Sequence, residues 1–99
     1  MHARVTTLEG APDKVDDGTR HVRERLLPQM RQHDGFEGFV ILADRQSGKM
    51  LAVALWEDEE ALRQSEEAMS RLRGETSQAT AATVAGVDRY DVTLFEMSG

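Results

Sequence analysis

Residues 35–72 contain two strand-like runs, one tryptophan and an amphipathic helix that begins with acidic residues. This continuous segment restricts the folds that the chain can adopt. The runs at residues 36–44 and 49–57 are both rich in apolar residues, and the short loop between them holds a glycine, as a hairpin loop does. Trp56 lies where the strand pattern gives way to the helix pattern. We therefore expect a sheet packed against helices, with a cavity that opens near this tryptophan.

The N-terminal third of the chain is predicted to form a strand and a helix. Residues 2–8 alternate loosely between two sides, as a half-buried strand does. Residues 12–33 repeat apolar side chains every three or four positions, which is the pattern of an amphipathic helix. Pro28 lies inside this helix and removes one backbone hydrogen bond, so we expect the helix to bend or to split there.

The C-terminal part is predicted to add a second helix and a last strand. The helix begins at the N-cap Asp58 and runs over residues 58–73, and residues 74–82 are either a loop or a frayed continuation of it. The last strand lies around residues 89–95. The order strand, helix, strand, strand, helix, strand predicts an α+β fold of the ferredoxin-like, split βαβ type with a four-stranded antiparallel sheet. Residues 1–99 are expected to form a single domain.

Such a sheet carries both helices on one face and leaves the other face bare. Side chains alternate between the two faces along a strand, and this alternation predicts that several apolar residues lie on the bare face. These residues are Val40, Leu42, Ala52, Ala54 and Phe95. A face of this kind is not expected to remain in water. Two such sheets facing each other make a dimeric α+β barrel, so we expect a homodimer.

The charge balance and the residue types exclude several classes of partner. Eighteen acidic residues against twelve basic ones give a net charge of −6, so neither nucleic acid nor an anionic membrane is expected to bind. The absence of cysteine and of a signal-peptide pattern at the N-terminus favours a cytoplasmic location. The three histidines are scattered, so no metal site is expected, and His21 and His33 are interpreted as structural.

Four short motifs spread along the chain carry a family resemblance. They are Gly35-Phe36-Glu37-Gly38 before the second strand, Pro28 in the first helix, Trp56-Glu57 before the second helix, and Tyr90-Asp91-Val92 in the last strand. With them the chain resembles the dimeric α+β barrel superfamily, and within it the antibiotic biosynthesis monooxygenase-like domains. The resemblance implies cofactor-independent oxidation of a phenolic or quinol-type aromatic polyketide in a barrel pocket. The alternative is a catalytically silent dimer that binds a small molecule or serves as an accessory or stress-response module.

The heme-degrading branch of that superfamily is set apart by two further residues. It uses an asparagine on the first strand and a histidine on the second helix, in addition to the tryptophan. This chain contains no asparagine, and residues 58–73 contain no histidine. We therefore expect no heme degradation and no cofactor.

Four residues are candidates for lining a substrate pocket: Trp56, Arg4, Tyr90 and Asp91. Trp56 either stacks on a planar ligand or fills the core of a chain with few aromatic residues. Arg4 and Asp91 lie on the first and last strands, which are neighbours in this topology, so an ion pair between them is preferred over substrate anchoring. Tyr90 donates a hydrogen bond either to a substrate oxygen or to the backbone. No catalytic base is identified.

Overall fold

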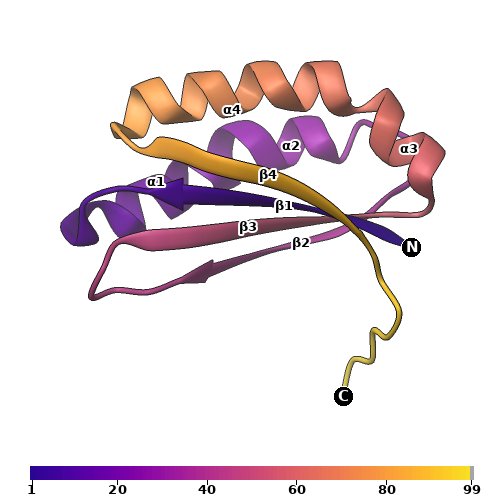
Figure 1. Cartoon of the computed structure of the whole chain (residues 1–99). Helices are drawn as coiled ribbons and strands as arrows, with labels where there is room; N and C mark the ends of the chain where they lie inside the picture. Colours follow the sequence, from indigo (N-terminus) through magenta and orange to yellow (C-terminus); the bar gives the residue numbers. More distant parts are fainter. Residues whose placement is uncertain (99) are drawn as a thin grey trace.

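Four strands form one sheet in the computed structural model, which describes residues 1–98 apart from the side chains of residues 79 and 80. In chain order the strands are β1 (His2–Glu9), β2 (Phe36–Ala43), β3 (Lys49–Trp56) and β4 (Thr83–Asp91). Their order in space is β2-β3-β1-β4, and all neighbouring strands are antiparallel. This is the ferredoxin-like α+β fold, so the prediction from the order of the elements is confirmed (Figure 1).

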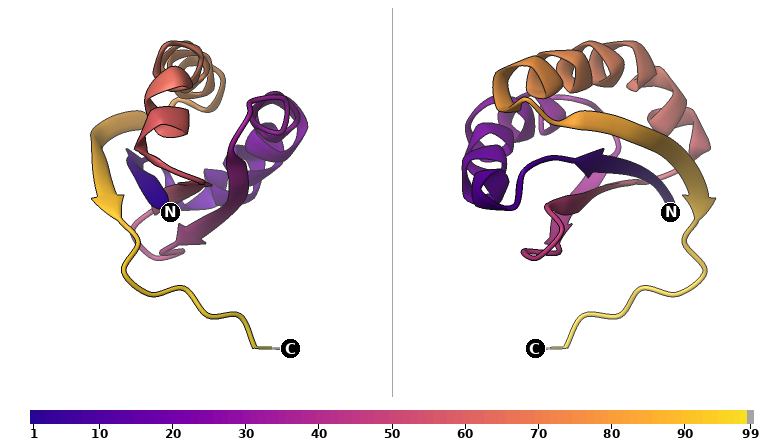
Figure 2. Two further views of the ribbon diagram at one scale, coloured as in Figure 1. Left: turned by 90° about the vertical axis from the view of Figure 1, so that its right-hand side faces the viewer. Right: turned by 60° about the vertical axis from the view of Figure 1, so that its left-hand side comes forward.

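The helices cover one face of the sheet and leave the other face open (Figures 1 and 2). The helical segments are η1 (Pro12–Lys14), α1 (Val15–His21), η2 (Val22–Leu26), α2 (Leu27–Met30), α3 (Glu59–Gln64) and α4 (Glu66–Thr80). Within residues 1–98, none of them is both long enough and apolar enough to cross a membrane.

Pro28 interrupts the first helical segment, as predicted. The turn before it, η2, is π-helical, because the backbone N–H of Leu27 donates to the carbonyl of Val22, five residues earlier. Proline has no N–H for the carbonyl four residues before it, which accounts for the interrupted hydrogen-bond pattern. Val22 and Leu26, at the two ends of η2, are both buried in the core.

The second helical segment is longer than predicted and is broken at Ser65. Asp58 caps α3 as predicted, since its carboxylate accepts a hydrogen bond from the backbone N–H of Ala61 at 2.8 Å. After the break, α4 continues to Thr80. Most of the stretch 74–82 is therefore helical, which decides between the two predicted alternatives.

The last strand lies earlier in the chain than predicted. β4 ends at Asp91 because its partner β1 begins at His2, the residue paired with Asp91. One further backbone hydrogen bond, from the N–H of Val92 to the carbonyl of Met1 at 2.9 Å, closes the pairing. Residues 93–98 extend beyond the sheet as an exposed tail on the side of the open face (Figure 2).

The placement of Ala52 and Ala54 on the bare face is wrong. Both alanines share the side of β3 that carries Trp56, and Trp56 is completely buried under the helices. Almost every residue of β3 is apolar, so hydrophobicity alone does not distinguish its two faces. The residues of β3 on the open face are Leu51, Val53 and Leu55.

The open face is nevertheless apolar. Val40 and Leu42 lie on it as predicted and are 44% and 51% exposed. Val40, Val53 and Val5 are paired across the neighbouring strands β2, β3 and β1, and they form an apolar row through the middle of this face. Phe95 does not belong to it, because it lies in the tail beyond β4.

Candidate ligand-binding site

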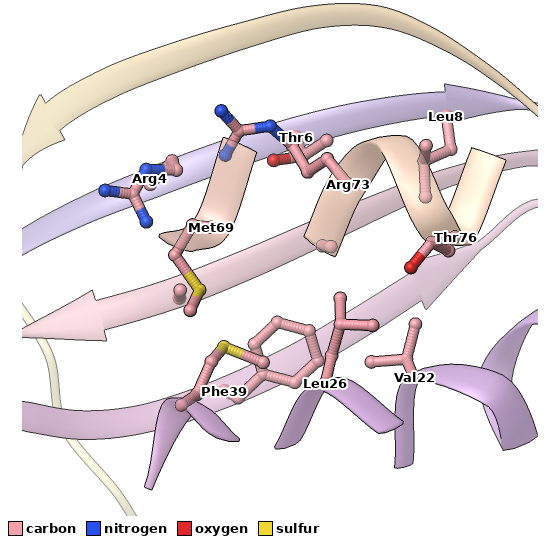
Figure 3. Close-up of a pocket in the computed structure, with 12 residues that line it drawn as sticks. Arg4, Thr6, Leu8, Val22, Leu26, Phe39, Met69, Arg73 and Thr76 are labelled. Carbon is pink, nitrogen blue, oxygen red and sulfur yellow. The ribbon is translucent and has the colours of Figure 1, made fainter. Parts of the chain in front are cut away.

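A cavity of about 40 Å³ lies between the covered face of the sheet and the helices (Figure 3). Most of its lining is apolar, and the lining residues are Arg4, Thr6, Leu8, Val22, Leu26, Met30, Phe39, Ala52, Ala54, Met69, Arg73 and Thr76. One water molecule needs roughly 10 to 15 Å³ by this kind of measure, so the cavity holds a few waters. A ring-shaped ligand therefore enters only if the walls move apart.

Small residues on β3 and one face of α4 define the shape of this cavity. Ala52 and Ala54 leave space above the sheet that larger side chains would fill. On α4, Met69, Arg73 and Thr76 follow one another at spacings of four and three residues, so they lie on the same side of the helix. The site is thus built from a sheet with short side chains and a helix that presents two polar residues.

Arg4 is buried on β1 and is held at the break between α3 and α4. Its Nη2 donates to the carbonyl oxygen of Leu62 at 2.8 Å and to Oγ of Ser65 at 3.0 Å. The Oε1 atom of Glu66 lies 3.2 Å from Nη2 and 3.4 Å from Nε. Burial lowers the pKa of the Arg4 guanidinium, while Glu66 acts in the opposite direction. An arginine stays protonated under these conditions, so Arg4 presents a fixed positive charge at the cavity wall.

The predicted ion pair between Arg4 and Asp91 is wrong. In the register of β1 and β4, Arg4 lies opposite Arg89, and Asp91 lies opposite His2. Asp91 accordingly contacts His2, with Oδ1 2.6 Å from Nε2. The two strands were correctly predicted to be neighbours. The partner of a residue, however, depends on the register of the strands, and Asp91 lies two positions away from the residue opposite Arg4.

Trp56 is completely buried next to Arg4. The guanidinium carbon of Arg4 lies 5.7 Å from the centre of the indole ring. Phe36 and His33 pack against the indole edge to face, with ring centres 5.5 and 6.3 Å away. Trp56 is not one of the residues that line the cavity. In this arrangement the tryptophan contacts Arg4, and Arg4 contacts the cavity.

Tyr90 and Asp91 lie away from this cavity. They line a separate, shallow hollow at the edge of the sheet, where Tyr90 is 55% exposed. The four residues predicted for one pocket are therefore divided among three places. Arg4 lines the cavity, Trp56 lies behind Arg4, and Tyr90 and Asp91 line the hollow.

Arg73 and Thr76 are lining residues that the sequence analysis missed. Thr76 lies beyond the end of the helix predicted over residues 58–73, and Arg73 is the last residue of that helix but was not singled out as a candidate. Arg73 is half-buried, and no described residue lies within hydrogen-bond or ion-pair distance of its guanidinium. Burial lowers the pKa of Arg73, while attraction to Glu66 opposes this effect and repulsion from Arg89 adds to it. The signal for both residues was present, since they continue the helical spacing of Met69.

The lining supplies no general base. None of its residues is a histidine, an aspartate or a glutamate. His21 and His33 lie outside the lining, and His33 packs against Trp56 instead. Within the described part of the chain, no three histidine or acidic side chains are grouped to hold a metal ion. The cavity is suited to binding and orienting an electron-rich molecule rather than to removing its proton.

The comparison with known families matches residues 1–70 to a family described as antibiotic biosynthesis monooxygenase. The chain belongs to this family. An uncharacterized protein of Mycobacterium tuberculosis strain H37Rv, Rv2558, is 38% identical to this family member over 94 residues, which are 95% of the chain and 39% of Rv2558. The chain thus spans about two-fifths of the length of the curated relatives that it matches.

Solved structures share the fold of this antibiotic biosynthesis monooxygenase family member at low sequence identity. A Streptomyces coelicolor monooxygenase from the gene ActVA-Orf6, in complex with nanaomycin D, has a TM-score of 0.75 at 16% identity and covers 99% of this chain and 92% of its own. The heme degrader MhuD of Mycobacterium tuberculosis has a TM-score of 0.76 at 19% identity, with coverages of 98% and 100%. A dimeric ferredoxin-like protein from an uncultured marine organism has a TM-score of 0.73 at 9% identity, with coverages of 99% and 100%.

Proposed function

We propose that the protein binds a planar aromatic small molecule in the cavity between sheet and helices and promotes its oxidation by molecular oxygen without a cofactor. The observation that carries this proposal is an apolar cavity with two arginines, Arg4 and Arg73, in its lining. Family membership supports the reaction class. The complex of a protein of the same fold with nanaomycin D supports the ligand class.

The two arginines favour the reactive form of such a substrate. A positive charge in a poorly hydrated site lowers the pKa of a phenol or quinol hydroxyl group, because it stabilises the anion. The anion is electron-rich and reacts with O₂ directly. With an anthrone, a ring CH₂ group becomes a carbonyl, one oxygen atom of O₂ enters the product, and the other leaves as water with the two hydrogens. With a naphthohydroquinone, the two hydroxyl hydrogens and two electrons pass to O₂, which gives the quinone and hydrogen peroxide. Water accepts the first proton, since the lining has no base.

The residues predicted from the sequence take different parts in this proposal. Arg4 adds its positive charge to the site while its donors are bound to Leu62, Ser65 and Glu66. Trp56 is a positioning residue that acts through Arg4. Tyr90 and Asp91 stay candidates for contact with a larger ligand that extends to the hollow at the sheet edge.

We expect oxygen uptake when an anthrone or a naphthohydroquinone is added, at a rate above that of heat-denatured protein. Ala52→Leu fills the cavity and is expected to lower this rate about tenfold, which corresponds to ~1.4 kcal/mol in the activation free energy. Ala43→Leu, at an exposed position of the same sheet, is the matched control. An oxygen electrode measures all three proteins. An unchanged rate in Ala52→Leu would show that the reaction takes place elsewhere.

The alternative function is that of a non-catalytic dimer that binds a small molecule or serves as an accessory or stress-response module. The absence of a general base from the cavity lining favours it. Saturable binding of a naphthoquinone that is lost in Ala52→Leu, without oxygen uptake from the corresponding hydroquinone, would select this alternative.

Hemin is not expected to bind tightly. No lining residue is a histidine that could ligate iron, and the cavity is far smaller than a porphyrin. Titration of hemin, followed in the Soret band, is the measurement, with hemin in buffer as the control. A sharp, shifted band that saturates at one hemin per chain would contradict this expectation and would indicate that His21 or His33 reaches the iron.

We also propose that a second copy of the chain covers the open face of the sheet. The valine row of Val5, Val53 and Val40 crosses this face. The tail lies on the same side and exposes 82% of Leu94 and 80% of Met97 (Figure 2). An apolar face and an apolar tail together form a patch of the kind that marks protein interfaces. The dimeric ferredoxin-like protein of the same fold supports this form of assembly.

A further inference from the structure

Arg73 differs from Arg4 and Arg89 because its charge has no close partner among the residues that the structure describes. Arg4 is occupied by the break between α3 and α4 and by Glu66. Arg89 donates from Nε to the same Glu66 carboxylate at 2.5 Å, and this bond holds the pKa of Glu66 below its ordinary value. Arg73 interacts with Glu66 only at longer range. Its donors are therefore available to a ligand.

The neighbours of Arg73 do not neutralise its charge. Three arginines, Arg4, Arg73 and Arg89, interact with the carboxylate of Glu66. Arg73 itself interacts with one carboxylate, Glu66, and with one like charge, Arg89, so its charge is not neutralised locally although the whole chain has a net charge of −6. A positive charge that is not neutralised locally attracts a small anion.

The position of Arg73 relates this charge to the cavity. Its side chain lines the cavity together with Thr6, and Leu26 and Val22 lie across from them (Figure 3). The guanidinium itself points toward β1 and away from Leu26 and Val22, so it lies at the edge of the cavity rather than inside it (Figure 3). A half-buried guanidinium with no close acceptor among the described residues is in an unfavourable environment. An anion placed there would supply charge-assisted hydrogen bonds that the protein itself does not provide.

We infer that the cavity selects aromatic carboxylates, with the carboxylate held by Arg73 and the ring placed among the apolar lining residues. This inference rests on the proposed function and adds the charge of the ligand to it. The planar guanidinium fork matches the two oxygens of a carboxylate. Arg73 is half-buried whereas Arg4 is buried, so the anion lies toward solvent and the ring points inward to Met69 and Leu26.

The test compares two ligands of the same shape that differ in charge. Calorimetry measures the affinity of the full chain for 2-naphthoate, which is ionised at neutral pH, and for the neutral 2-naphthamide. We expect 2-naphthoate to bind about tenfold more tightly, the ratio that one charge-assisted contact provides. Arg73→Gln is expected to remove this preference by weakening 2-naphthoate about tenfold, while 2-naphthamide changes less than about twofold.

Arg71→Gln is the matched control, because Arg71 lies two positions away on α4, is exposed, and changes the net charge equally. An equal loss of 2-naphthoate affinity in Arg71→Gln would overturn the inference, since the effect would then come from overall charge. Equal binding of the two ligands to the unmodified protein would also overturn it but would leave the proposed function standing. Failure of both naphthalene ligands and of naphthoquinone to bind would overturn the inference and the proposed function together.

Discussion

Trp56→Ala is expected to lower the free energy of unfolding by about 3 to 5 kcal/mol. The indole is completely buried and packs against Phe36, His33 and the guanidinium of Arg4. Its removal leaves a cavity in the core and uncovers one side of a buried charge. Chemical denaturation followed by circular dichroism measures the change, at one protein concentration because the stability of the proposed dimer would depend on concentration.

Trp56→Phe separates packing from ligand contact. If Trp56 acts only through Arg4, the affinity for 2-naphthoate changes less than about twofold, and acrylamide barely quenches the tryptophan fluorescence of the unmodified protein. Direct stacking on a ligand, the first of the two interpretations made from the sequence, instead requires a loss of about 0.5 to 1.5 kcal/mol in binding. That loss, together with fluorescence accessible to acrylamide, would contradict the positioning role.

Val53→Asp is expected to disrupt the dimer that we propose for the open face. Val53 lies at the centre of the valine row, between Val5 and Val40, so a second sheet on this face would bury the new carboxylate without a partner. In a two-fold symmetric interface the substitution occurs twice, and we expect the dissociation constant to rise at least about a hundredfold. Light scattering coupled to size-exclusion chromatography gives the mass of each form.

Ser70→Asp is the control for this experiment. Ser70 is exposed on α4, on the helical side of the molecule, so the same added charge is expected to leave the dimer intact. A monomer formed by the unmodified protein at micromolar concentration would contradict the assembly proposed for the open face. Circular dichroism of Val53→Asp distinguishes a folded monomer from an unfolded chain.

The element order was predictable because it depends on local patterns, whereas the faces of β3 were not. Helical spacing, the Asp58 cap and the glycine-containing hairpin loop are local patterns. Each of them involves residues that are only a few positions apart in the sequence. Residues 50–56 are apolar throughout, so only the tertiary contacts of Trp56 reveal which side of β3 is covered. Residues 92–95 have the composition of a strand, but most of them extend past the first residue of β1 and have no partner strand.

The candidate site was predictable only in part, because its residues meet through the register of the sheet and the length of α4. Arg4 was identified as a candidate from its place on the first strand, but its partner Glu66 lies on a helix rather than on the neighbouring strand. Thr76 was missed because Gly74 weakens the helical signal before it, and Arg73 because a charged residue at the end of a predicted helix is expected to face solvent. Burial of Leu72 and Thr76 outweighs that weak propensity and keeps the helix intact.

The π-helical turn η2 bears on how fast and how tightly any ligand is taken up. Val22 and Leu26 place this turn in the cavity wall, next to a proline that leaves the hydrogen-bond pattern interrupted. We expect such a wall to separate at a lower energetic cost than the regular turns of α4, and we therefore expect a ligand to enter as the first helical segment moves outward. A measured dissociation constant then includes the small fraction of molecules that are open. We therefore expect the selectivity of the site for ligands with one ring over ligands with several fused rings to depend on the stiffness of that helical segment. It depends on this stiffness as much as on the side chains that the ligand contacts.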